Sequence, residues 1–137
     1  MGAMLLRVLG MAVDEVPGRT IHPSLKGSAM DAWDLATIDR TRASEGQRYR
    51  EFLRVPDLSA GLYVLEANAA DPQSPHTEDE LYYVVSGRGL VTVGDETREV
   101  VAGSLVFVAA QVPHRFSDIS DRLEVLVVFG PAEGARG

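Results

Sequence analysis

From about residue 47 to residue 129, short runs of β-branched and aromatic residues alternate with turn-forming residues. This alternation limits the fold more than any other feature, because Val, Ile, Tyr and Phe favour strands whereas Gly, Pro and Asp interrupt them. Many short strands at close spacing are typical of an all-β sandwich or barrel. The candidate strands are residues 47–55, 61–67, 80–85, 89–93, 97–101, 104–109 and 123–129.

Two glycine-containing breakers predict tight connections between these strands. Gly94-Asp95 lies between two candidate strands and suits a two-residue hairpin turn. Gly87-Arg88-Gly89 is also interpreted as a hairpin turn, since it is too short to form a nucleotide-binding loop. The second half of the chain is therefore predicted to be all-β.

The N-terminal part of the chain has a different character. Residues 1–30 are interrupted by proline and glycine, which predicts an irregular arm with at most one short strand. In the segment Asp31–Arg42, Trp33 and Ile38 fall near one helical face, which predicts a short helix. The alternative is a loop whose Trp33 fills part of the core. A length of 137 residues suits one domain with a single core, assigned here to residues 31–137.

Composition argues against several functional classes. The net charge of −7 and the single lysine, Lys26, argue against nucleic acid, because proteins that bind it concentrate Lys and Arg. No apolar run approaches the roughly 18–20 residues that span a membrane, and Asp14-Glu15 interrupts the N-terminal apolar stretch before any signal cleavage site. The absence of cysteine excludes disulfides and thiolate metal sites, and the cytoplasm is the expected compartment. The sequence also contains no serine nucleophile elbow and no phosphate-binding loop.

Residues 74–89 read SPHTEDELYYVVSGRG and place a histidine and acids directly before a strand. On a strand, His76 and Glu80 would share one face, and a helix would also bring the two together. Imidazole and carboxylate ligands suit iron, manganese, nickel or zinc. Taken alone, the spacing favours a charged surface loop over a metal site. A second histidine, His114, follows Pro113 after the strand at 104–109, so it would approach from a different strand.

These two stretches resemble the two motifs of the cupin superfamily. The first motif runs Gly, five residues, His-x-His, three or four residues, Glu, six residues, Gly. Here it covers about residues 68–87, with His76 at the second histidine and Glu80 and Gly87 at the matching positions. The second motif covers about residues 103–118, from Gly103 to Asp118, with His114 at its histidine. The resemblance implies a single-domain jelly-roll barrel, the double-stranded β-helix.

The sequence departs from the family pattern at several positions. Ser74 replaces the first histidine, and Gln73 beside it could supply an amide oxygen if a bulge turned that residue inward. Ala109 and Gln111 replace the proline and glycine of the second motif, which alters its turn. Asp118 replaces the final asparagine and is not expected to bind a metal.

The resemblance implies a divalent metal, Fe, Mn, Ni or Zn, bound by His76, Glu80 and His114, with Gln73 as a further candidate. The alternative is a barrel in which these residues merely hydrogen-bond one another. Three other residues are candidates for lining the cavity or, alternatively, for ordinary core packing: Tyr82, Phe107 and Phe116. Three remaining ionisable residues are interpreted as solvated acids (Glu78, Asp79) and as an ordinary histidine of the arm (His22).

Two functions are compatible with such a barrel. It could be an oxygenase or isomerase acting on a small organic molecule, with Glu80 also able to serve as a base. It could instead be a non-catalytic module that binds or senses a small ligand, with a structural metal or none. An open coordination position beside a reachable cavity would favour the enzyme. The resemblance also implies a homodimer, for which Tyr49, Phe52 and Tyr63 are candidate interface residues.

Overall fold

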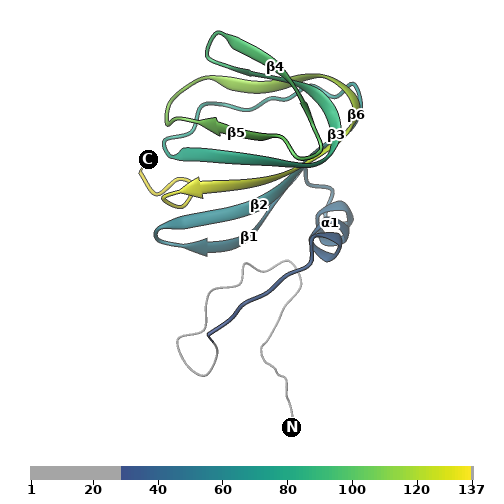
Figure 1. The fold of residues 1–137 in the computed structure, drawn as a ribbon. Coiled ribbons are helices and arrows are strands. Elements are labelled where there is room, and N and C mark those ends of the chain that lie inside the picture. The colour runs from purple at the N-terminus through teal and green to yellow at the C-terminus, as the bar shows by residue number, and fades with distance from the viewer. Residues whose placement is uncertain (1–28, 137) are drawn as a thin grey trace.

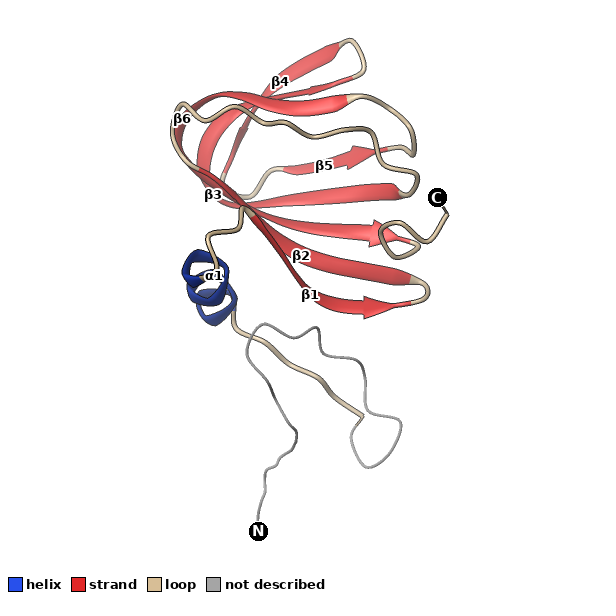
Figure 2. Cartoon of the chain, turned by 180° about the vertical axis from the view of Figure 1, so that it is seen from behind, coloured by secondary structure: helices blue, strands red, loops and turns tan. Residues whose placement is uncertain are grey.

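The computed structural model describes residues 29–136. One helix precedes six antiparallel strands, and the strands form one sheet in the order β1-β2-β6-β3-β4, with β5 paired to β3. Figures 1 and 2 show that this sheet curls into a barrel, with the helix against the outside of β1 and β2. The elements are α1 (Leu35–Ser44), β1 (Tyr49–Val55), β2 (Leu58–Leu65), β3 (Asp79–Val93), β4 (Glu96–Val101), β5 (Leu105–Val108) and β6 (His114–Gly130).

The predicted all-β architecture is confirmed, but two of its strands are longer than expected. The candidates at 80–85 and 89–93 are two halves of β3, and the candidate at 123–129 is only the second half of β6. The interpretation of Gly87-Arg88-Gly89 as a hairpin turn is therefore wrong. These residues form an irregular, bulged stretch where the register of β3 against β6 shifts between Val84 and Leu90. Glycine is required here because Gly87 has φ +101° and lies against the backbone of Arg122.

The second glycine-containing connection agrees with its prediction. Val93 of β3 pairs with Glu96 of β4, so Gly94 and Asp95 form a two-residue hairpin connection. Gly94 has φ +62°, a backbone conformation that glycine adopts without a steric penalty.

The sheet has an apolar inner face and an outer face that α1 covers in part. The helix begins four residues later than predicted, and Ile38 is buried against Leu62 and Val64 on the outside of β2. Trp33 precedes the helix and packs edge-on against Phe52, with ring centroids 5.1 Å apart. The inner core is made of Tyr63, Leu65, Tyr82, Val84, Val91, Val100, Val108, Phe116, Ile119, Leu123, Val125, Val127 and Phe129.

The structure bears on the predicted interface residues, whereas the predicted N-terminal arm and His22 lie largely outside the described residues. Tyr63 lies in the inner core with Tyr49 packed against it, and Phe52 packs beside Trp33, so the prediction that these residues form a subunit interface is wrong for Tyr63. The predicted arm at 1–30 lies outside the described residues except for its last two, and so does His22. Among residues 29–136, no helix is long and apolar enough to cross a membrane.

Candidate metal centre

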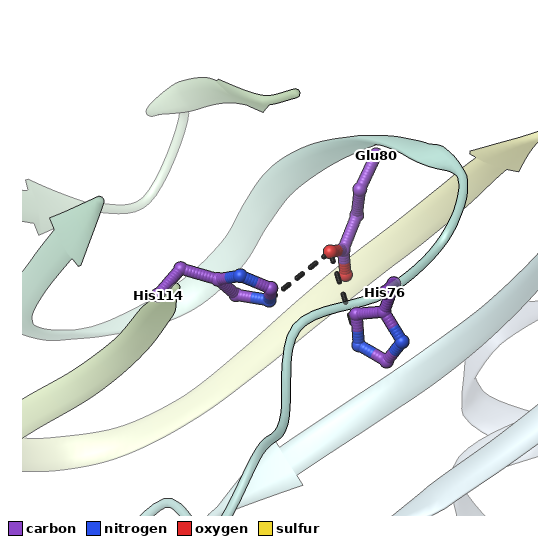
Figure 3. A group of neighbouring side chains, drawn as sticks. All are labelled: His76, Glu80 and His114. Atoms are coloured by element: carbon purple, nitrogen blue, oxygen red, sulfur yellow. Dashed lines mark ion pairs between the residues drawn. The ribbon is translucent and has the colours of Figure 1, made fainter. Parts of the chain in front are cut away.

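His76, Glu80 and His114 come together at one end of the barrel (Figure 3). One nitrogen or oxygen atom of each lies within 4.8 Å of the corresponding atoms of the other two. His114 Nε2 is 3.2 Å from Glu80 Oε1, and His76 Nε2 is 4.0 Å from the same oxygen. Glu80 and His114 are buried, whereas the side chain of His76 is 21% exposed. The triad is therefore closed on the core side and reachable through His76.

Strand pairing explains how residues so far apart in sequence meet. Glu80 lies near the start of β3 and pairs with Val108, the last residue of β5. The turn after β5 then leads directly to His114, the first residue of β6. His76 lies in the loop before β3 rather than on the strand itself, so the predicted shared strand face is not what brings it to Glu80. Its carbonyl accepts a hydrogen bond from Gln111 N at 2.7 Å, which ties this loop to the turn that carries His114.

The ring of His114 is oriented by a backbone hydrogen bond. Its Nδ1 is 2.8 Å from the carbonyl oxygen of Val112, which can only accept, so Nδ1 carries the proton. In the neutral ring, Nε2 then presents its lone pair toward Glu80, as a metal-binding imidazole requires. Burial alone would lower the pKa of His114, but the Glu80 carboxylate and the Val112 carbonyl outweigh it and raise the pKa.

The donor set fits a metal ion. Among residues 29–136, Glu80 Oε1 and His114 Nε2 are buried atoms without a hydrogen-bond partner, although each faces the other. Leaving a buried polar atom unpaired costs about 1–3 kcal/mol. A cation between these atoms would satisfy both, and two imidazoles with one carboxylate form a facial set that leaves other coordination positions open.

Gln73 lies in the irregular segment before β3 and lines the pocket beside the triad. Its Nε2 donates to Asp71 Oδ2 at 2.7 Å, and its Oε1 accepts from the hydroxyl of Tyr82 at 3.1 Å. Asp71 also accepts hydrogen bonds from the Tyr63 hydroxyl and the Phe116 backbone, so Gln73 is held by a well-connected carboxylate. Gln73 as a metal ligand stays a prediction.

The aromatic residues predicted to line the cavity have different positions. Tyr82 and Phe116 are buried in the core behind the triad, with ring centroids 4.9 Å apart, and the Tyr82 ring lies 6.2 Å from that of His114. Phe107 is 60% exposed, so its prediction is wrong. Glu80 and Tyr82 point inward on β3, hence Leu81 between them points outward, and so does its partner Phe107 on β5.

The prediction that Glu78 is a solvated acid is wrong as well. Its side chain is buried and accepts hydrogen bonds from Thr77 and from the backbone N–H groups of Gly134 and Arg136. Burial would raise the pKa of Glu78, but these hydrogen bonds outweigh it and lower the pKa. Asp79 is exposed and accepts a hydrogen bond from the Ala110 backbone. Glu78 therefore holds the C-terminal segment beside the site.

A pocket of about 140 Å³ opens beside the triad, lined by Tyr49, Tyr63, Gln73, His76, Glu80, Val127, Phe129 and Glu133. Glu133 Oε2 lies 3.5 Å from His76 Nδ1, and burial raises the pKa of its carboxyl group even though His76 opposes the shift. The site predictions omit Glu133, because nothing in the C-terminal sequence signals its return to the barrel mouth. They omit Val127 and Phe129 as well, although alternation along the strand at 123–129 could have placed both inside.

Comparisons with known proteins concern the family and the fold. The model of the family described as Cupin domain matches residues 61–129. An uncharacterized protein of Streptomyces coelicolor is 49% identical over 104 residues, which cover 76% of this chain and 99% of that protein. A solved structure from Thermus thermophilus is 25% identical with a TM-score of 0.61, over 75% of this chain and 99% of that one. An RmlC-like cupin from Shewanella frigidimarina has a similar fold, with 21% identity and a TM-score of 0.58 over 65% and 79% of the two chains.

Proposed function

The chain belongs to the cupin family, and from this premise we propose that it binds one divalent transition metal and acts enzymatically on a small organic molecule. The proposed protein ligands are His76, Glu80 and His114. The observation that carries this proposal is the pair of buried, unpartnered atoms among the described residues, Glu80 Oε1 and His114 Nε2. When the His114 ring is neutral, two atoms with lone pairs face one point, which is costly without a cation and favourable with one.

The pocket supports an enzyme because it adjoins the open side of the triad. A metal held there would supply Lewis-acid chemistry toward an oxygen-bearing ligand. The chain's own residues would exclude water and orient the ligand: Val127 and Phe129 form an apolar wall, while Gln73 and Glu133 offer polar atoms. Oxygenase and isomerase are the two proposed reaction types, with Glu80 as a candidate base in either.

Metal content measures the proposed function directly. After incubation with Fe²⁺, Mn²⁺, Ni²⁺ or Zn²⁺ and gel filtration, we expect near-stoichiometric metal in the wild type and little in His76→Ala. Loss is expected because His76 is one of the three proposed protein ligands. His22→Ala is the matched control, since His22 lies outside both motifs and should leave the metal content unchanged. Failure of the wild type to retain any of the four metals would contradict the proposal.

We also propose that the chain forms a homodimer, through a patch defined here as the apolar grid. On the outer face, Leu81 pairs with Phe107 and Val128, and Tyr83 pairs with Leu105 and Leu126. Leu105 and Phe107 are 63% and 60% exposed, and Leu81 and Tyr83 are 43% and 41% exposed. The grid continues the cluster under α1, because Leu126 also pairs with Leu62 of β2. A second copy of the chain fits the apolar grid best. Across a two-fold axis the same patch meets its own copy, and an uncharged face can do so without bringing like charges together.

Light scattering after gel filtration checks the homodimer. We expect twice the chain mass for the wild type and the chain mass for Phe107→Glu, because an unpaired carboxylate buried in the interface is costly. Met30→Glu is the control, since Met30 is an exposed apolar residue outside the apolar grid. Its mass should equal that of the wild type. A monomeric wild type would contradict the proposed homodimer and would leave the apolar grid to another partner.

A further inference from the structure

Among residues 29–136, a third buried side-chain atom lacks a hydrogen-bond partner: the hydroxyl oxygen of Tyr49. The proposed metal accounts for the other two atoms, on Glu80 and His114, but not for this one. Tyr49 lines the same pocket as His76 and Glu80. A buried hydroxyl without a partner destabilises a fold, so its presence beside a site indicates a partner that arrives with the ligand.

The local backbone is built to hold the Tyr49 ring in place. Gly61 lies beneath it on β2, and a Cβ added at Gly61 would overlap the Cζ, Oη and Cε1 atoms of the ring. On its other side the ring packs edge-on against Tyr63, with ring centroids 6.3 Å apart. The absence of a side chain at Gly61 therefore makes room for the end of the Tyr49 ring, and packing fixes the buried hydroxyl beside the pocket that Tyr49 lines.

The charge and the volume of the pocket restrict the class of ligand that it can bind. Burial, and after it the carboxylates of Glu133 and Glu51, raise the pKa of Tyr49, so the hydroxyl stays protonated and donates a hydrogen bond. An acceptor on the ligand would therefore satisfy this proton. The pocket volume of about 140 Å³ is close to that of an engineered cavity, about 150 Å³, which holds benzene. A divalent metal with the Glu80 carboxylate and two neutral imidazoles keeps one positive charge at the metal itself, which an anionic oxygen ligand would neutralise, while Glu133 brings a second carboxyl group to the pocket wall.

We propose that Tyr49 is a specificity-determining residue that donates a hydrogen bond to one oxygen of a small carboxylate whose other oxygen binds the metal. This inference rests on the proposed metal centre and names its ligand class: a monocarboxylate of about six non-hydrogen atoms. Gly61 is the positioning residue for the Tyr49 ring.

Ligand binding to the cobalt-loaded protein tests the hydrogen bond. Propionate is the probe, and imidazole is the control ligand, because it binds a metal through one nitrogen and offers no acceptor to a hydroxyl. Binding is followed by the visible absorption of Co²⁺. Tyr49→Phe should raise the propionate dissociation constant about tenfold, as expected for one lost hydrogen bond. Imidazole affinity and cobalt content should not change. Unchanged propionate affinity at full cobalt content would overturn the inference and leave the metal centre standing.

Thermal unfolding of the metal-free protein tests Tyr49 without the metal. Tyr49→Phe should raise the melting temperature by about 4 °C, because it removes an unpaired buried hydroxyl. Tyr63→Phe is the matched variant: Tyr63 lines the same pocket, but its hydroxyl bonds Asp71 Oδ1 at 2.6 Å, so its melting temperature should fall. A fall for Tyr49→Phe would show that the hydroxyl is structural and would overturn the inference. Absence of cobalt uptake would overturn the proposed function, and this measurement would still decide the role of Tyr49.

Discussion

Replacing Glu80 by glutamine is expected to weaken metal binding about a hundredfold or more. Structural zinc sites gain about 10–16 kcal/mol from four ligands, or roughly 3 kcal/mol for each. Glu80 supplies the only carboxylate of the triad and lies 3.2 Å from His114 Nε2, so glutamine keeps the shape but removes the charge that faces the cation. Competition with a chromophoric chelator measures the affinity, and circular dichroism verifies the fold.

The matched control for this variant is Asp118→Asn. Asp118 belongs to the second motif, yet it is exposed and has φ +46°, a conformation that asparagine tolerates. Its substitution removes one carboxylate from the motif without touching the triad. Metal affinity should equal that of the wild type. A loss as large in Asp118→Asn as in Glu80→Gln would mean that overall charge, rather than ligation by Glu80, governs binding.

Replacing Gly87 by alanine is expected to lower the free energy of unfolding by about 3 kcal/mol. The added Cβ would overlap the carbonyl of Arg122 and approach Leu123 Cα, and these are backbone atoms that cannot rotate away. The residue must also keep a left-handed backbone at φ +101°. Steric overlap and conformational strain therefore add, and urea denaturation measures their sum.

Gly103→Ala separates the two contributions. Gly103 also has a left-handed backbone, at φ +93°, but no atom lies within 4 Å of its added Cβ. The free energy of unfolding of Gly103→Ala should fall only by the cost of the left-handed backbone, about 1–2 kcal/mol. Equal losses in the two variants would show that the close approach of β3 to β6 at Gly87 contributes nothing.

The strands and the triad could be predicted from the sequence because both depend on local patterns. Runs of strand-forming residues marked at least part of every strand, and the spacing of His76, Glu80 and His114 matched the family motifs before any geometry was known. The continuity of β3 could not be predicted. Gly87-Arg88-Gly89 has the composition of a turn, and only its contact with Arg122 on β6 shows that the strand continues through it.

The pocket was harder to predict because it depends on pairing between strands. Phe107 was expected inside, but its direction follows from its pairing with Leu81, which the sequence of β5 alone does not give. Glu78 resembled a solvated acid because its hydrogen-bond donors, at Gly134 and Arg136, lie more than fifty residues away. Tyr49 was assigned to a surface for the same reason, since its direction depends on Gly61 across the β1–β2 pair.

The pairing of β6 with both β2 and β3 has a consequence for the order of events during folding. His114 is the first residue of this strand, and Phe129 near its far end contributes to the pocket wall. Because contacts between distant parts of a chain form late, the ligand set is complete only after the last strand has been added. If the proposed metal centre forms, the barrel would be largely folded before all three ligands could hold an ion. Metal uptake would then be a maturation step that follows folding.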